Sequence, residues 1–160
     1  MSFALIPVMV LTFFLSIMAI EYGRATDVLP STSVTQATSN GQTFIAYSNA
    51  VALYQKNNPT FNGTVSGTAL AAQGTPFPSD FLAIAGNAIT ASGTSGHVIT
   101  CYASLPTGAI TAITSAIGND AAYGTASGTN WTSIAPGATA QPLTTTVPNG
   151  AVVSVIQVGT

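Results

Sequence analysis

A chain of 160 residues accommodates one modest domain with an appendage, and only 4 % of its side chains are charged, against about 25 % in soluble proteins. Its two Lys and Arg side chains cannot form a phosphate-binding face, so we expect no nucleic acid partner. The single cysteine excludes a disulfide scaffold, and a hydrophobic content of 47 % argues against a disordered chain.

An uncharged apolar run, FALIPVMVLTFFLSIMAI, occupies residues 3–20. At about 1.5 Å per residue a helix over this run is about 27 Å long, close to the roughly 30 Å of a bilayer's hydrocarbon core. The run therefore predicts a transmembrane helix, with the lipid bilayer as the partner of residues 3–20. A cleaved secretory signal is the alternative, although no Lys or Arg precedes Arg24 and no AxA cleavage motif follows the run.

Half of the charged side chains follow the apolar run directly, as Glu21, Arg24 and Asp27. We interpret these three, with the aromatic Tyr22 among them, as the membrane boundary, because charges and interfacial aromatics lie where a span meets water. We expect the amino terminus in the cytoplasm and residues 28–160 on the outer side of the membrane, in the periplasm if the cell is Gram-negative.

Three segments follow from this reading. Residues 1–27 form the hydrophobic helix and its boundary, and residues 28–41 form a linker or a continuation of the helix. Pro30 and Gly41 disfavour the helical alternative. Residues 42–160 form a small α+β domain on the far side of the membrane.

An apolar stripe at helical spacing marks residues 42–57, with Phe44, Tyr47, Val51 and Tyr54 separated by three, four and three positions. This stripe predicts an amphipathic helix whose apolar face packs on a sheet. The sequence Asn-Asn-Pro at 57–59 ends the helix.

Downstream, residues 60–96 are rich in loop signals around one short apolar patch, FLAIAGNAIT, which suits either a strand or a helix. HVITCYAS at 97–104 predicts a strand, and Ile110, Ile113 and Ile117 recur at helical spacing ahead of Gly118. The tail NGAVVSVIQV predicts a strand after a turn at 148–150. The expected domain is one helix packed on a mostly antiparallel sheet.

Groups suited to catalysis are scarce. His97 is the one imidazole, and a strand would place it on the same face as Cys101, so a dyad is conceivable. Of the four carboxylates, only Asp80 and Asp120 lie beyond the membrane boundary to form an acid/base pair. No zinc, phosphate-loop or thiol-pair motif is present. We expect no enzyme, no cofactor and no metal, and keep a hydrolase that uses His97 as a minor hypothesis.

The layout resembles a known family in two stretches, YSNAVALYQKNNPTFNGTV at 47–65 and PLTTTVPNGAVVSVIQ at 142–157, with HVITCY and GAITAITSAIGN between them. It is similar to the PilM family of small inner-membrane proteins of type IVb pilus systems, including those of conjugative plasmids. The resemblance implies a pilin-like domain and a non-enzymatic, membrane-anchored structural component of the pilus assembly apparatus. Other pilus-assembly proteins or copies of the chain itself would be its partners.

A subunit of an extracellular pilus-like filament, with the hydrophobic helix in the filament core, is the alternative. The low charge and the Gly/Thr-rich stretch 118–146 suit a packed subunit. A pilin would carry a short basic leader and a Glu five residues into its apolar helix, whereas the residue here is Leu5.

Overall fold

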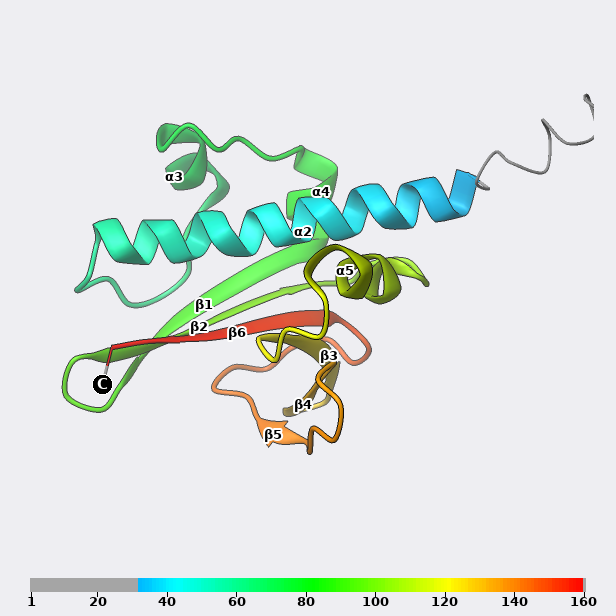
Figure 1. Cartoon of the computed structure of the whole chain (residues 1–160). Helices are drawn as coiled ribbons and strands as arrows, with labels where there is room; N and C mark the ends of the chain where they lie inside the picture. Colours follow the sequence, from blue (N-terminus) through cyan, green and yellow to red (C-terminus); the bar gives the residue numbers. More distant parts are fainter. Residues whose placement is uncertain (1–31, 160) are drawn as a thin grey trace, which may run out of the picture. The chain divides into compact units, whose positions relative to one another are not determined.

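The computed structural model describes residues 32–159 and holds an antiparallel sheet with helices packed on it (Figure 1). Contacts group the chain into two units, residues 1–35 and 36–160, and the sheet belongs to the second. In chain order the elements are α2 (Thr32–Asn57), α3 (Gly67–Ala72), α4 (Ser79–Ile84), β1 (Ala85–Ser92), β2 (Gly96–Ala103), α5 (Ala109–Ile117), β3 (Tyr123–Ser127), β4 (Asn130–Ser133), β5 (Gln141–Pro142) and β6 (Val152–Val158).

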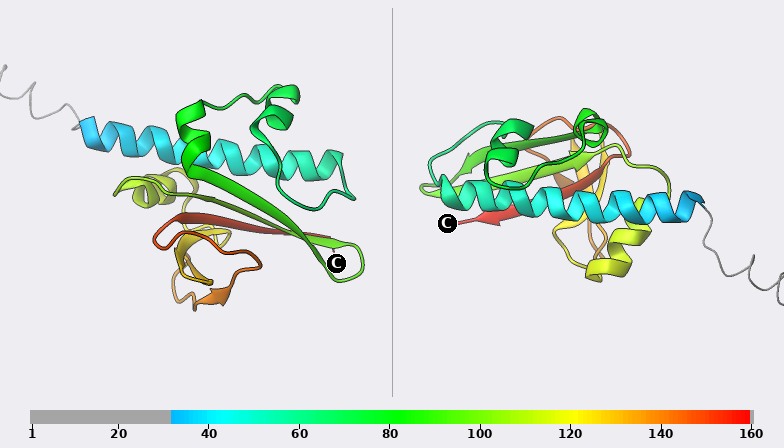
Figure 2. Two further views of the ribbon diagram at one scale, coloured as in Figure 1. Left: turned by 180° about the vertical axis from the view of Figure 1, so that it is seen from behind. Right: turned by 90° about the horizontal axis from the view of Figure 1, so that it is seen from above.

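Within residues 32–159 six strands form one sheet in the order β1-β2-β6-β3-β4-β5, and each neighbouring pair is antiparallel. The last strand, β6, therefore lies in the middle, between β2 and β3. α2 runs over one face of β1, β2 and β6, while β3, β4 and β5 lie on the far side of β6 (Figure 1 and Figure 2). The expected α+β class with a helix and an antiparallel sheet is confirmed.

The core lies between α2 and the sheet. Ile89 pairs with Ile99, and Ile99 pairs with Ile156, so β-branched side chains form a row across three strands. Phe44 and Val51 of α2 pack in the same cluster, and both are fully buried. β-branched residues fit a pleated surface, and burying each large apolar side chain contributes about 1.5–3 kcal/mol. The helix and the central strands therefore stabilise each other.

Several predicted elements coincide with observed ones. The strand expected at 97–104 is β2, and the helix expected ahead of Gly118 is α5, which ends where Gly118 takes a φ of 70°. The tail strand is β6. The apolar patch FLAIAGNAIT, which suited either a strand or a helix, contains parts of both. α4 ends at Ile84 and β1 begins at Ala85.

α2 is longer than the helix expected at 42–57, because it begins at Thr32 and runs through Gly41. The expectation that Gly41 disfavours a helix was wrong, because this glycine packs closely against α5. A Cβ at this position would lie 3.1 Å from the Ala109 carbonyl oxygen and 3.3 Å from Cγ1 of Ile113, both on α5. Close approach of two helices requires a small residue here, and that packing outweighs the roughly 1 kcal/mol cost of a helical glycine.

The Gly/Thr-rich stretch 118–146 contains the strands β3, β4 and β5. Gly128, with a φ of 63°, turns the chain between β3 and β4. On the sheet face opposite α2, a second small apolar cluster joins this region to the end of the chain through Ala126, Val147, Ala151 and Val153.

The expected transmembrane helix at 3–20 and the boundary residues Glu21, Tyr22, Arg24 and Asp27 lie outside the described residues. Among the helices of residues 32–159, none combines the length and the apolar character that a membrane span needs.

Candidate interaction surface

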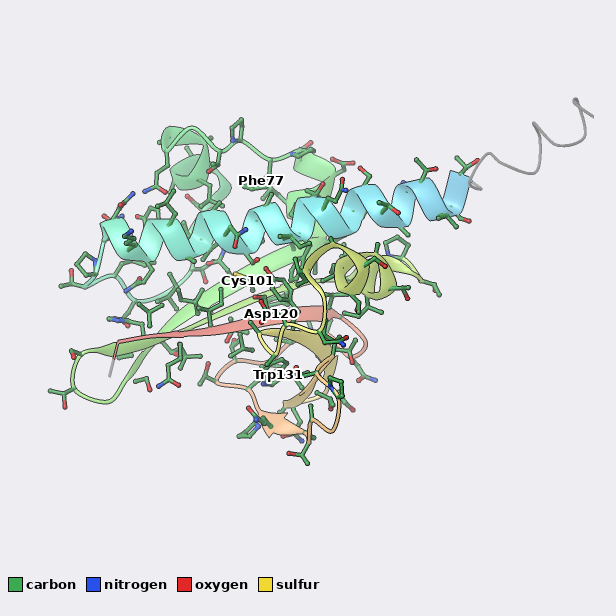
Figure 3. All side chains as sticks on the ribbon, viewed as in Figure 1. Phe77, Cys101, Asp120 and Trp131 are labelled. Carbon is green, nitrogen blue, oxygen red and sulfur yellow. The ribbon has the colours of Figure 1, made fainter. Side chains whose placement is uncertain are left out.

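The predicted packing stripe of α2 faces the core. Phe44, Tyr47 and Val51 are buried, and Tyr54 is half-buried with its ring edge-on to Phe61, 5.2 Å between ring centroids. The ring of Tyr47 makes two further edge contacts, with Phe77 at 5.4 Å and Phe81 at 5.5 Å. Figure 3 shows Phe77 above α2, in the segment that covers this side of the helix. The stripe therefore fixes α2 rather than forming an accessible site.

A buried amide ties α2 to the edge of the sheet. Asn87 of β1 donates through Nδ2 to the Tyr47 hydroxyl at 2.7 Å and to the Val65 carbonyl at 2.9 Å. Its Oδ1 accepts from the Val65 backbone N–H at 2.7 Å. Burial raises the pKa of Tyr47 to about 12, and the hydrogen bond from Asn87 acts in the opposite direction. This network holds elements in place and presents no group to solvent.

The second polar contact under α2 joins it to β3. The hydroxyls of Ser48 and Tyr123 lie 2.8 Å apart and share a hydrogen bond in the core. Burial raises the pKa of Tyr123, and the bond with Ser48 lowers it. Both tyrosines thus remain neutral structural groups at physiological pH.

The conceivable His97–Cys101 dyad does not form. Both residues are on β2, but four strand positions correspond to about 13 Å, beyond the reach of a hydrogen bond. Cys101 is 1 % exposed, and burial raises the pKa of its thiol, which opposes formation of the thiolate. Cys101 is one of the small buried residues of the core between α2 and the sheet.

The two candidate carboxylates have separate surroundings. Asp80 lies in the first turn of α4, and Asp120 lies in the link from α5 to β3, where its Oδ1 accepts from the Ala122 backbone N–H at 2.9 Å. Both are exposed. Within residues 32–159 no cluster of His, Cys, Asp and Glu could hold a metal ion.

The surface of the described domain is almost without charge. Across residues 32–159 the formally charged side chains are Lys56, Asp80 and Asp120, all exposed and far apart in the sequence. Such a surface gives little electrostatic repulsion between neighbouring molecules, which favours association over dispersal. The surface is therefore suited to contacts with other proteins.

Two of the sheet edges are protected. On the outer side of β1, Gly63 and Ile89 exchange two backbone hydrogen bonds, of 2.9 and 2.8 Å, and Asn87 binds Val65. At the other end of the sheet, β5 is two residues long and contains Pro142, which has no N–H to donate.

A third edge is open, because β3 covers only the first part of β6. Paired positions on this side end at Ser154, after which the Val155 N–H donates to the Ala122 carbonyl at 2.8 Å. Backbone groups alternate along a strand, so the N–H and C=O of Gln157 point the same way as those of Val155. No strand of the described residues pairs with Gln157 on that side. We call this side of residues 156–158 the β6 edge.

A shallow pocket of about 470 Å³ lies beside the β6 edge. Trp131 of β4 forms one wall, with alanines around it, and β6 contributes Val155, Ile156 and Gln157. None of the lining residues is charged. Figure 3 labels Trp131 on the β3–β4 side of β6, together with Asp120 where the chain enters β3.

Reasoning from the sequence did not find Trp131 or the β6 edge. Tyr123, Ala126 and Trp131 are buried around the glycine turn at Gly128, a pattern typical of a short hairpin. The edge itself has no local signal, because it exists only where β3 departs from β6.

A comparison with protein families identifies one family. The family model of PilM matches residues 11–155. The fold is similar to the crystal structure of a protein of Escherichia coli B7A that carries the name PilM, with a TM-score of 0.58 at 15 % identity. That alignment covers 81 % of this chain and 98 % of the other. A comparison with curated proteins finds no match. Since the family model spans most of the sequence, the resemblance stated above is confirmed, and the chain belongs to the PilM family.

Proposed function

We propose that the chain is a non-enzymatic, membrane-anchored structural component of a type IVb pilus assembly apparatus. Residues 3–20 hold it in the bacterial inner membrane, with Glu21, Tyr22, Arg24 and Asp27 at the water boundary, and the domain lies in the periplasm. Its partners are other pilus-assembly proteins or copies of itself.

Two observations support this proposal together: the family to which the chain belongs, and the low charge of its domain surface. The chain belongs to the PilM family, which makes it a pilus-related protein, and its described domain is almost uncharged. A neutral, hydroxyl-rich surface suits contacts with neighbouring proteins. The proposal assigns no reaction to the chain, and His97 and Cys101 are too far apart along β2 to act together.

One observation also favours the alternative, a subunit of an extracellular pilus-like filament. A filament brings copies into lateral contact, and a nearly uncharged domain has little to repel a neighbour. In that case the apolar run at 3–20 would pack against copies of itself in the filament core.

Cell fractionation separates the two. We expect the full chain in the inner-membrane fraction, and we expect a variant without residues 3–20 to leave that fraction. Gln42→Cys introduces a cysteine at an exposed position of α2. It should react with a membrane-impermeant maleimide in cells whose outer membrane is permeable and whose inner membrane is intact. Recovery with sheared pili would support the filament subunit instead. A soluble cytoplasmic chain would contradict both.

A further inference from the structure

We propose that a second copy of this chain pairs with the β6 edge, strand to strand and antiparallel, through Gln157. This inference deepens the structural role proposed above and rests on it for the setting in which two copies meet. Figure 1 shows the C-terminal part of β6 extending past β3 and β4, and Gln157 and Val158 in this part are exposed.

A specific contact opens this edge. The Val155 N–H donates to the Ala122 carbonyl, but the Ala122 N–H turns to Oδ1 of Asp120, at 2.9 Å, instead of returning a bond to β6. The Asp120 side chain therefore directs the chain away from β6 at the point where pairing could have continued. Beyond it, no backbone group of residues 32–159 pairs with the outward N–H and C=O of Gln157.

The β6 edge differs from the other two edges in lacking protection. Soluble proteins usually guard exposed strands with lysine, proline, a bulge or a covering loop. The β1 edge has the Gly63 bridge, and β5 has Pro142, whereas residues 156–158 contain neither a charge nor a proline. An unguarded edge is a template for another strand.

The sequence around Gln157 fits a copy of itself. In an antiparallel pair centred on Gln157, its N–H and C=O exchange two hydrogen bonds with Gln157 of the second copy. Ile156 of each copy then lies opposite Val158 of the other, on the face that carries α2. Val158 is 41 % exposed in the single chain. In the pair, Ile156 of the other copy covers it, and symmetry gives this contact once for each copy.

Charge and shape agree with this occupant. Two identical edges can meet only if they do not repel each other, and no charged residue lies on β6 or lines the adjacent pocket. Two hydrogen bonds and two apolar pairs make a weak contact in dilute solution. Anchoring both copies in one membrane would raise their effective concentration and favour the pair.

Proline scanning tests the backbone contact in the full chain, purified in detergent. Gln157→Pro removes the outward N–H and leaves the bonds to β2 unchanged, so the domain should keep its circular dichroism spectrum and melting behaviour. The matched control Gln157→Ala keeps the N–H. We expect wild type and Gln157→Ala to form dimers in sedimentation equilibrium, and Gln157→Pro to have a dimer affinity lower by about tenfold or more.

Disulfide trapping tests the register. A hydrogen-bonded pair places its two Cα atoms about 5.5 Å apart, within the range that a disulfide spans. We expect Gln157→Cys to form a cross-linked dimer at least about tenfold faster than Gln42→Cys, which replaces another exposed glutamine, on α2. The native Cys101 is buried and serves as the unreactive background.

The inference is overturned if Gln157→Pro unfolds the domain, since its N–H would then be used within the chain, or if this variant associates like wild type. Equal cross-linking at positions 157 and 42, or a product other than a dimer of the chain, would also overturn it. These results leave the proposed function standing, because fractionation and pilus formation are measured separately. A trapped dimer in a chain that does not reach the membrane would refute the proposed function alone.

Discussion

At the scale of single residues, the domain depends on a few buried polar groups placed among apolar ones. Asn87 saturates both backbone groups of Val65 and the hydroxyl of Tyr47 with one side chain. A buried amide is costly unless its hydrogen bonds are made, and here all of these partners are within 2.9 Å. Asn87 therefore fixes the segment after α2 against β1.

Replacing this amide should destabilise the domain strongly. Asn87→Leu leaves the Val65 N–H and C=O and the Tyr47 hydroxyl without partners in the core, and we expect the free energy of unfolding to fall by about 2–4 kcal/mol. Asn49→Leu, at an exposed position of α2, is the matched control and should change it little. Urea denaturation followed by circular dichroism measures both. Equal effects of the two substitutions would show that the network does not stabilise the fold.

The raised pKa of Tyr47 predicts a loss of stability in alkali. Burial raises its pKa to about 12 in the folded chain, against an ordinary value of about 10 when unfolded. The stability linked to this proton is fully present below about pH 10 and is lost as the pH rises toward about 12, because the unfolded chain releases the proton first.

The test compares wild type with Tyr47→Phe, which has no proton to release. The free energy of unfolding should decline less steeply with pH in the variant between about pH 9.5 and 11.5. Tyr123 and Cys101, whose pKa values are also raised by burial, are present in both proteins. Parallel pH profiles would contradict the assignment.

At the scale of elements, close helix packing explains a glycine that the sequence presents as a helix breaker. α2 and α5 approach each other at Gly41, where a Cβ would lie 3.1 Å from the Ala109 carbonyl. A large side chain at this position would have to push α5 away from α2. The same contact explains why α2 does not end at Gly41.

Gly41→Leu should therefore lower the stability of the domain by about 1–3 kcal/mol through overpacking against α5. The neighbouring change Gln42→Leu adds the same side chain on the exposed side of α2 and improves helix propensity, so we expect no loss of stability. Melting temperatures of the two variants provide the comparison. A more stable Gly41→Leu would show that the helices do not meet there.

The local sequence pattern predicted the helices and strands that have a clear composition or periodicity. It did not predict the strands whose formation depends on contacts between residues distant in the sequence. The stripe at Phe44, Tyr47 and Val51 identified the packing face of α2, β-forming residues identified β2, and the turn at 148–150 identified β6. The strands β3 and β4 were missed because their residues are mostly small and polar, and their pairing depends on Gly128 and on burial of Trp131.

The candidate surface was harder to foresee than the fold. Low charge and the absence of a catalytic constellation were visible in the composition, and they indicated contacts between proteins. The β6 edge depends on where β3 begins to pair with β6, which Asp120 sets through one hydrogen bond from the Ala122 N–H. No periodicity in the sequence encodes such a departure.

At the scale of the whole molecule, the parts combine into one physical account. A long apolar run and a cluster of charges precede a small α+β domain whose surface is almost neutral and whose central strand is partly unpaired. We propose that such a chain serves pilus assembly as a structural part, through contacts with other proteins.

Counting pili on cells that lack the native chain tests this claim most directly. A triple variant, His97→Ala with Asp80→Asn and Asp120→Asn, removes the imidazole and both exposed carboxylates of residues 32–159, while a second variant lacks residues 3–20. We expect the triple variant to restore pili to at least about half of the wild-type number, and the second variant to restore none. Loss of pili with a folded, membrane-bound triple variant, or full restoration without residues 3–20, would contradict it.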